Sequence, residues 1–179
     1  MQIKSGGPVM PIEFDITLTS KDMYRFNMYQ TYSGFHGWFS IIVAICAFIV
    51  AGVTYGKVEL TYTIIYIVFG IVFLLYLPVT LYVRSGHSLA ASRILGKPLH
   101  YAVDGEGIGV SQGEESAKLP WEQIYKMVAT KHNVLIYSNR INAYVIPREQ
   151  LGDRYADLAG LAASKLEKYR VKMQQDGSR

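Results

Sequence analysis

The chain has 179 residues, of which 50% are hydrophobic and 18% charged, and its formal net charge is +4. The charges are dispersed: three Lys and Arg balance three acids in residues 1–37, and Lys and Arg outnumber acids by three to one in 38–96 and by twelve to ten in 97–179. No segment carries the basic stripe that binding to a phosphate backbone requires. We therefore expect no nucleic-acid partner.

The residue types used for metal binding and nucleophilic catalysis are sparse. The single cysteine, Cys46, excludes an intrachain disulfide and a cysteine-based metal site. No phosphate-binding glycine loop or nucleophile motif is present. The four histidines also lack metal-ligand spacing: His36, His87, His100 and His132. We therefore expect no catalytic residue, metal or cofactor.

The N-terminal region predicts a strand followed by a helix. Residues 1–11 lack the pattern of a cleaved signal, and either Met1 or Met10 is a candidate native start. Apolar and polar residues then alternate from Ile12 to Leu18, the period of a half-buried strand. Thr19 to Asp22 supplies a helix N-cap with an acid in the first turn, so we expect a helix over about 21–32. Its apolar stripe, with Met23, is expected on the membrane surface or on the soluble domain.

Two apolar runs, at about 38–56 and 60–83, contain no charged residue. Roughly 20 apolar residues in a helix cover the ~30 Å hydrocarbon core of a bilayer. The connector is only Lys57-Val58-Glu59, so the runs predict two antiparallel helices that cross the membrane as a hairpin.

The orientation of this hairpin follows from the basic residues beside it. Lys21 and Arg25 precede the first span, and Arg84, Arg93 and Lys97 follow the second, whereas the connector has one lysine. Cytoplasmic flanks carry the excess of Lys and Arg, so both termini are predicted to be cytoplasmic. No charged residue lies at mid-membrane depth, which disfavours an ion pathway.

The first helix of the hairpin is expected to have two distinct faces. Small residues share one face of the first helix, which we assign to the second helix, and larger residues share the opposite face, which would meet lipid or another copy. Pro78 should bend the second helix, and Gly70 is a candidate contact point. The small face is Ser40, Ala44, Ala47 and Ala51, and the large one Ile42, Ile45, Phe48 and Ile49.

The region after the hairpin predicts a small antiparallel β domain. The second helix should continue beyond Val83 and stop at Gly96-Lys97-Pro98. A final amphipathic helix is expected over about 153–173. Between them lie six short strand-like runs separated by turn residues: 100–104, 108–112, 116–119, 125–131, 134–138 and 143–146.

These elements predict an α+β membrane protein in which a two-helix hairpin accompanies a pleckstrin-homology-like barrel closed by a C-terminal helix. Such a barrel usually has seven strands, so the run before the hairpin is expected to supply the missing one. The predicted segments are a strand and juxtamembrane helix at 12–36, the hairpin with its extension at 37–96, and the domain at 97–175.

Several short motifs in this order resemble the YcxB-like family of small bacterial membrane proteins. The resemblance covers most of the chain beyond Ile12, and it implies a fold rather than a chemistry, because the family has no established activity. It also implies a bacterial cytoplasmic (inner) membrane. The motifs are Tyr101-Ala102-Val103-Asp104, Glu106-Gly107-Ile108, Leu119-Pro120-Trp121, Ile124-Tyr125 and Tyr144-Val145-Ile146-Pro147-Arg148.

Five residues are candidate contacts for a partner or for lipid. Trp121 is interpreted as a plug for an open barrel end, with ligand stacking as the alternative. Arg148 marks a strand end, with a contact to a partner or lipid headgroup as the alternative. Lys168, Arg170 and Lys172 would complement the end of the final helix, or attract anionic lipid.

The sequence thus predicts a membrane-tethered cytoplasmic interaction or scaffolding module without catalytic activity of its own. Its expected partners are membrane lipid and a protein partner or further copies of the chain through the hairpin. The alternatives are a small transport or channel subunit acting as an oligomer and a membrane-surface enzyme.

Overall fold

The computed structural model describes residues 11–91 and 96–173. Its contacts divide the chain into two compact units. One joins the residues up to Met23 with those from Leu89 onward, and the other runs from Tyr24 to Ser88. Since the first unit is assembled from both flanks of the second, the hairpin is inserted into a single domain.

The first helix begins at the predicted cap. Strand β1 spans Ile12–Ile16 and helix α1 spans Ser20–Tyr32. The amide of Asp22 donates to Thr19 Oγ1 at 3.3 Å, and the amide of Thr19 donates back to Asp22 Oδ2 at 3.1 Å. This reciprocal pair is a capping box, which satisfies backbone donors that a helix start leaves unpaired.

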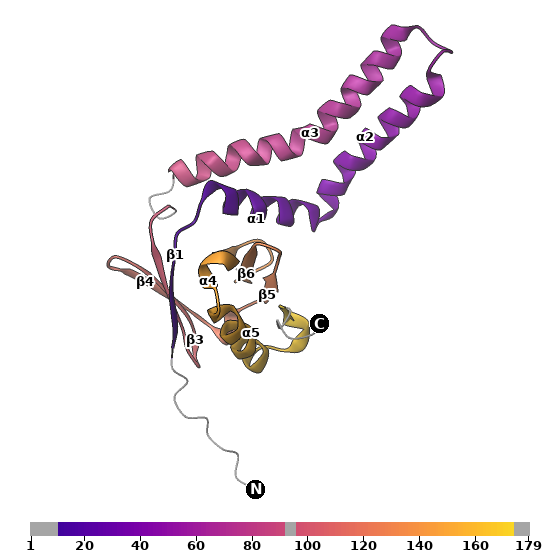
Figure 1. Ribbon diagram of the computed structural model, residues 1–179. Coiled ribbons are helices and arrows are strands. Elements are labelled where there is room, and N and C mark those ends of the chain that lie inside the picture. Colours follow the sequence, from indigo (N-terminus) through magenta and orange to yellow (C-terminus); the bar gives the residue numbers. More distant parts are fainter. Residues whose placement is uncertain (1–10, 92–95, 174–179) are drawn as a thin grey trace. The chain divides into compact units, whose positions relative to one another are not determined.

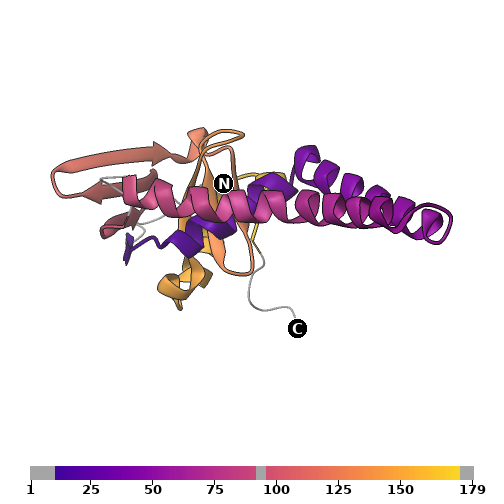
Figure 2. The ribbon, with the colours of Figure 1, turned by 90° about the horizontal axis from the view of Figure 1, so that it is seen from above.

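The apolar runs form two antiparallel helices, α2 (Phe35–Thr54) and α3 (Leu60–Ala91). They run side by side in Figure 1, and in the view from above they overlap (Figure 2). Ala44, Ala47 and Ala51 are buried, and Ser40 Oγ donates to the carbonyl of Phe73 at 2.5 Å. The predicted small-residue face is therefore confirmed, because small side chains let the backbones approach closely.

The opposite face of α2 is apolar and largely exposed. Ile42, Ile45 and Ile49 are 49%, 52% and 59% exposed. Phe48, which was also predicted for this face, is 36% exposed, and its ring reaches α3 as well: a Cβ added at Gly70 would lie 2.7 Å from it. The ring packs on α3 there because Gly70 has no side chain, which confirms Gly70 as a contact point.

Both helices are long and apolar enough to cross a membrane, by length and composition, over Gly37–Thr54 and Leu60–Ser88. Helix α3 continues past Val83 as predicted and holds Pro78 in its interior. Figure 1 shows α3 changing direction along its length. The sequence predicts that this helix stops at residues 96–98. Residues 92–95, which precede this stop, lie outside the described residues.

Within the same unit, the later part of α3 contacts α1. Asn27 Nδ2 donates to Ser85 Oγ at 2.9 Å, and the rings of Tyr24 and Tyr82 meet edge to face at 5.8 Å between centroids. The hydroxyl of Ser85 also donates to the carbonyl of Leu81. These contacts make α1 a third helix of the helical unit.

The domain contains two four-stranded sheets. The first has the order β1-β2-β3-β4 and the second the order β7-β6-β5-β8. The six strands predicted after the hairpin are all present, at slightly different bounds. They are β2 (Leu99–Val103), β3 (Gly107–Gln112), β4 (Glu115–Pro120), β5 (Lys126–Ala129), β6 (Asn133–Tyr137) and β7 (Ala143–Pro147).

Strand β1 completes the first sheet, as the strand count predicted. It pairs antiparallel with β2, with Phe14 opposite Tyr101. The predicted segments were 12–36, 37–96 and 97–175. The compact units instead divide the chain after Met23 and after Ser88. Figure 1 shows β1 entering the sheet beside elements that follow the hairpin in the sequence.

The C-terminal part differs from the single long helix expected over 153–173. The short α4 (Arg148–Leu151) and α5 (Arg154–Lys165) are followed by the 3-10 turn η2 (Lys168–Arg170) and β8 (Val171–Lys172). Leu166 has the extended angles φ −112° and ψ 150°. The helix ends there because the chain turns to pair β8 in parallel with β5.

Apolar side chains from both sheets and from α5 form the core of the domain. Asn133 ties this core to the backbone of Asp22 within the same unit, since its Nδ2 donates to the carbonyl of Asp22 at 3.2 Å. Among the described residues, several large core side chains are essentially inaccessible to solvent: Ile16, Val103, Ile108, Ile124, Leu135, Ile146 and Leu158.

Candidate functional site

The turn between β2 and β3 is fixed by Asp104. Its Oδ1 accepts hydrogen bonds from the amides of Glu106 at 2.8 Å and Gly107 at 2.9 Å, and Lys118 Nζ lies 3.1 Å from its Oδ2. Partial burial raises the pKa of Asp104, but these amides and Lys118 outweigh that effect and lower it overall. Asp104 is thereby held as a carboxylate that organises the turn.

Trp121 belongs to the same cluster. It lies in the 3-10 turn η1 (Trp121–Gln123), is 3% exposed, and its indole Nε1 donates to the carbonyl of Asp104 at 2.9 Å. Its amide donates to the carbonyl of Glu106. The side chain is thus enclosed within the fold, which favours the structural interpretation over ligand stacking.

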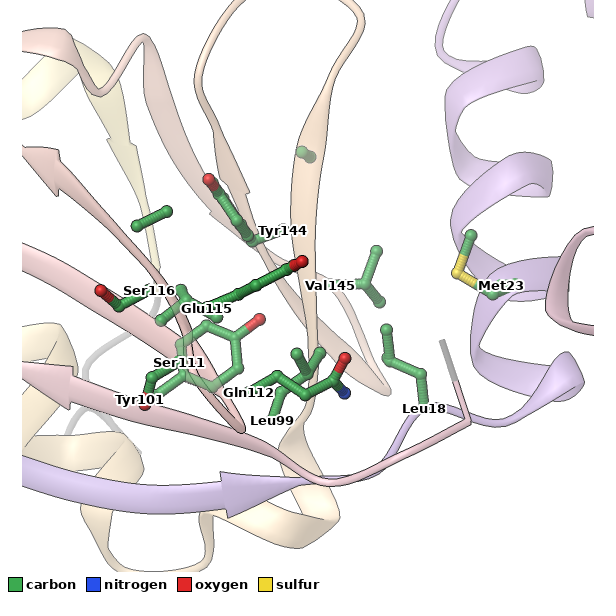
Figure 3. Close-up of a pocket in the computed structure, with 13 residues that line it drawn as sticks. Leu18, Met23, Leu99, Tyr101, Ser111, Gln112, Glu115, Ser116, Tyr144 and Val145 are labelled. Atoms are coloured by element: carbon green, nitrogen blue, oxygen red, sulfur yellow. The ribbon is translucent and has the colours of Figure 1, made fainter. Parts of the chain in front are cut away.

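A pocket of about 360 Å³ opens between the two sheets (Figure 3). Its walls come from β2, β3 and β4 of the first sheet and from β7 of the second. In the close-up, Leu18 and Met23 lie toward one end, and Ser116 and Tyr144 toward the other. This volume falls in the range of pockets that hold small ligands or the side chains of a partner.

The lining is mostly apolar with a few polar groups. Leu99, Val110 and Val145 contribute apolar surface. Burial, followed by the neighbouring Tyr144, raises the pKa of Tyr101 well above its ordinary value. The Tyr101 phenol therefore stays neutral and can only donate or accept hydrogen bonds.

This pocket lies between two strands that are each at the edge of a sheet. Strand β4 ends the first sheet and β7 ends the second, and both contribute lining residues, among them Ser116 and Ala143. Edge strands carry backbone groups that can pair with an added strand. The arrangement, which we call the seam pocket, can accept an extended chain as well as apolar groups.

A second cavity, of about 470 Å³, is lined by three basic side chains. They are Lys131 from the turn between β5 and β6, Arg148 from the start of α4 and Lys172 from β8. We call it the basic pocket. The structure thus brings together two of the five predicted contact residues, Arg148 and Lys172, and adds Lys131, which the sequence analysis did not select.

Comparison with known families identifies part of this domain. Residues 103–161 match the family model described as YcxB-like protein. The chain carries a YcxB-like domain. The matched segment begins at the end of β2 and reaches into α5, so it includes the Asp104 turn, Trp121 and Arg148. No curated protein and no solved structure matches the chain.

The remaining predicted contacts lie after the matched YcxB-like segment. The expectation that Lys168, Arg170 and Lys172 end a helix was wrong, because α5 ends at Lys165. Arg170 instead donates to the carbonyls of Glu122, Ile124 and Tyr125. It therefore fastens the C-terminal turn to the loop before β5, while Lys168 is exposed in η2.

Over residues 11–91 and 96–173, no group of three or more His, Cys, Asp or Glu side chains could hold a metal ion. Lys131 carried no sequence signal of its own, since it sits in a turn, where exposed lysines are common. Lys131 differs from other exposed lysines only because its turn lies near α4 and β8, which supply Arg148 and Lys172 to the same cavity.

Proposed function

We propose that this protein is a membrane-tethered interaction or scaffolding module, without catalytic activity of its own, at the cytoplasmic face of a bacterial inner membrane. The hairpin anchors the chain, and the domain displays a binding site. The domain is of the pleckstrin-homology-like type, a proposal supported by two antiparallel meanders and a closing helix.

The observation that carries this proposal is the pairing of β1 with β2 across the inserted hairpin. A strand that precedes two spans can join a sheet that follows them only if both flanks lie on one side of the membrane. Lys and Arg at these flanks favour the cytoplasmic side. The exposed apolar side chains of α2 and α3 support contact with lipid.

The seam pocket is the proposed partner site. An extended segment of a partner protein would add to an edge strand and place apolar side chains in the pocket, a mode that many interaction domains use. The volume, the apolar lining and the position between β4 and β7 all support this mode.

Site-specific photo-crosslinking in native membranes tests the partner site. A photoreactive phenylalanine analogue at Ser116, on the rim of the seam pocket, should give a discrete protein adduct. The same analogue at Ala163, exposed on α5, is the control and should not give that adduct.

A variant that fills the seam pocket is compared with the parent chain. Ala143→Trp places a large ring in the lining and should abolish the Ser116 adduct. Identical adducts from Ser116 and Ala163, or an adduct that persists in Ala143→Trp, would contradict the proposed site.

A further inference from the structure

The basic pocket combines three positive charges with no acidic lining residue. Lys131 and Lys172 are exposed, and Arg148 is half-buried. Within residues 11–91 and 96–173, these three side chains form no salt bridge. Like charges that line one cavity repel one another, so three basic residues in this pocket favour an anionic occupant.

Arg148 is held in place by its surroundings. Its guanidinium carbon lies 4.1 Å from the centroid of the Tyr155 ring, a cation–π arrangement. Its amide donates to the carbonyl of His132 at 2.8 Å, which ties the start of α4 to the turn between β5 and β6. A stacked guanidinium keeps its N–H edges available, and this planar fork suits phosphate oxygens.

The backbone positions of the two lysines are also fixed by hydrogen bonds and strand pairing. The turn that carries Lys131 is closed by Thr130, whose Oγ1 donates to the carbonyl of Asn133 at 2.9 Å and accepts from its amide at 3.0 Å. Lys172 is placed by the parallel pairing of β8 with β5, opposite Val128. Fixing the backbone in advance lowers the entropic cost of binding.

We propose that the basic pocket binds a phosphate group, with Arg148 as the oriented ligand and Lys131 and Lys172 as the flanking charges. The phosphate belongs either to a lipid headgroup or to a free phosphate. This site is separate from the seam pocket and does not rest on the partner proposed there.

The test uses the full chain in a zwitterionic detergent. Thermal unfolding is followed during titration with inorganic phosphate, against chloride at equal ionic strength. A second titration uses short-chain phosphatidic acid, with short-chain phosphatidylcholine as the control. A ligand that binds only the folded state raises the unfolding temperature.

Three variants locate the effect. Arg148→Gln should weaken binding about tenfold or more, as expected for losing hydrogen bonds to a charged group. Lys131→Gln removes an exposed charge from the pocket and should weaken binding without disturbing the fold. Lys168→Gln makes the same charge change outside the pocket and should leave binding unchanged.

The outcomes are distinct. Stabilisation by inorganic phosphate that is lost in Lys131→Gln supports the site with free phosphate as ligand. Stabilisation by phosphatidic acid alone, lost in the same variant, supports it with a lipid headgroup as ligand. Stabilisation by neither ligand, or equal losses in Lys131→Gln and Lys168→Gln, would overturn the proposal.

Discussion

Phe14 and Tyr101 stack face to face across β1 and β2, with their ring centroids 5.4 Å apart and their planes 9° from parallel. Both side chains are buried, at 3% and 1% exposure. The entire hairpin lies between them in the sequence. This aromatic pair is therefore a direct link between the two flanks of the helical hairpin.

Removing one ring of this pair should destabilise the domain. Phe14→Ala is expected to lower the free energy of unfolding by about 3 kcal/mol or more, since it leaves a cavity beside Tyr101. Glu13→Ala, at the adjacent exposed position, should change it by less than about 0.5 kcal/mol. Denaturant unfolding in detergent measures both, and similar values for the two variants would show that β1 is not part of the core.

Two neighbouring glycines give a matched test of the Asp104 turn. A Cβ at Gly107 would lie 2.4 Å from the carbonyl oxygen of Leu119, whereas the nearest atom to a Cβ at Gly105 is Lys165 Nζ at 3.8 Å. Gly107→Ala should therefore cost about 2 kcal/mol or more, because the backbone of β4 must shift. Gly105→Ala should be much milder in the same unfolding assay, and the reverse ranking would refute this account of the turn.

Packing within the hairpin predicts a contrast between two substitutions on α2. Ala47→Leu enlarges a residue on the buried face and should destabilise the helical unit by about 1–3 kcal/mol. Ile45→Leu lies on the exposed face and should have little effect. Thermal unfolding in detergent compares them, and equal stabilities would exclude the assigned helix faces.

The lowered pKa of Asp104 predicts a pH-dependent contribution to stability. A carboxylate whose pKa is depressed on folding stabilises the protein above its unfolded pKa of about 3.9, and this contribution is lost as the pH falls through the folded pKa. Asp104→Asn should thus be less stable than the parent chain at pH 7, and the difference should shrink on acidification.

Thermal unfolding at pH 7 and at pH 3 checks this prediction. Asp157→Asn, on the exposed side of α5, controls for the change in net charge. A difference for Asp104→Asn that is the same at both pH values would mean that its ionisation does not stabilise the turn.

The sequence predicted most of the elements because their signals are local. Alternation and turn residues located the strands from β2 to β7, and the apolar runs located α2 and α3. The end of α5 was missed because Tyr169 and Met173 continue its helical spacing. The pairing of β8 with β5 that overrides this spacing joins distant parts of the chain.

The candidate sites were only partly predictable, because they also depend on contacts between distant parts of the chain. Arg148 and Lys172 were selected separately, but their meeting with Lys131 depends on how three elements converge. The seam pocket was not predicted at all. Its lining comes from the edges of two sheets, and no single stretch of sequence reveals which strands will be edges.

Labelling of single cysteines tests the central claim, that the hairpin is inserted into one cytoplasmic domain. In a Cys46→Ala background, cysteines replace Glu13 in β1, Val58 in the connector and Ala163 in α5, and intact cells are treated with a membrane-impermeant thiol reagent. The account predicts labelling at position 58 alone, with positions 13 and 163 reacting only after lysis. Labelling of position 13 or 163 in intact cells, or of position 58 only after lysis, would contradict it.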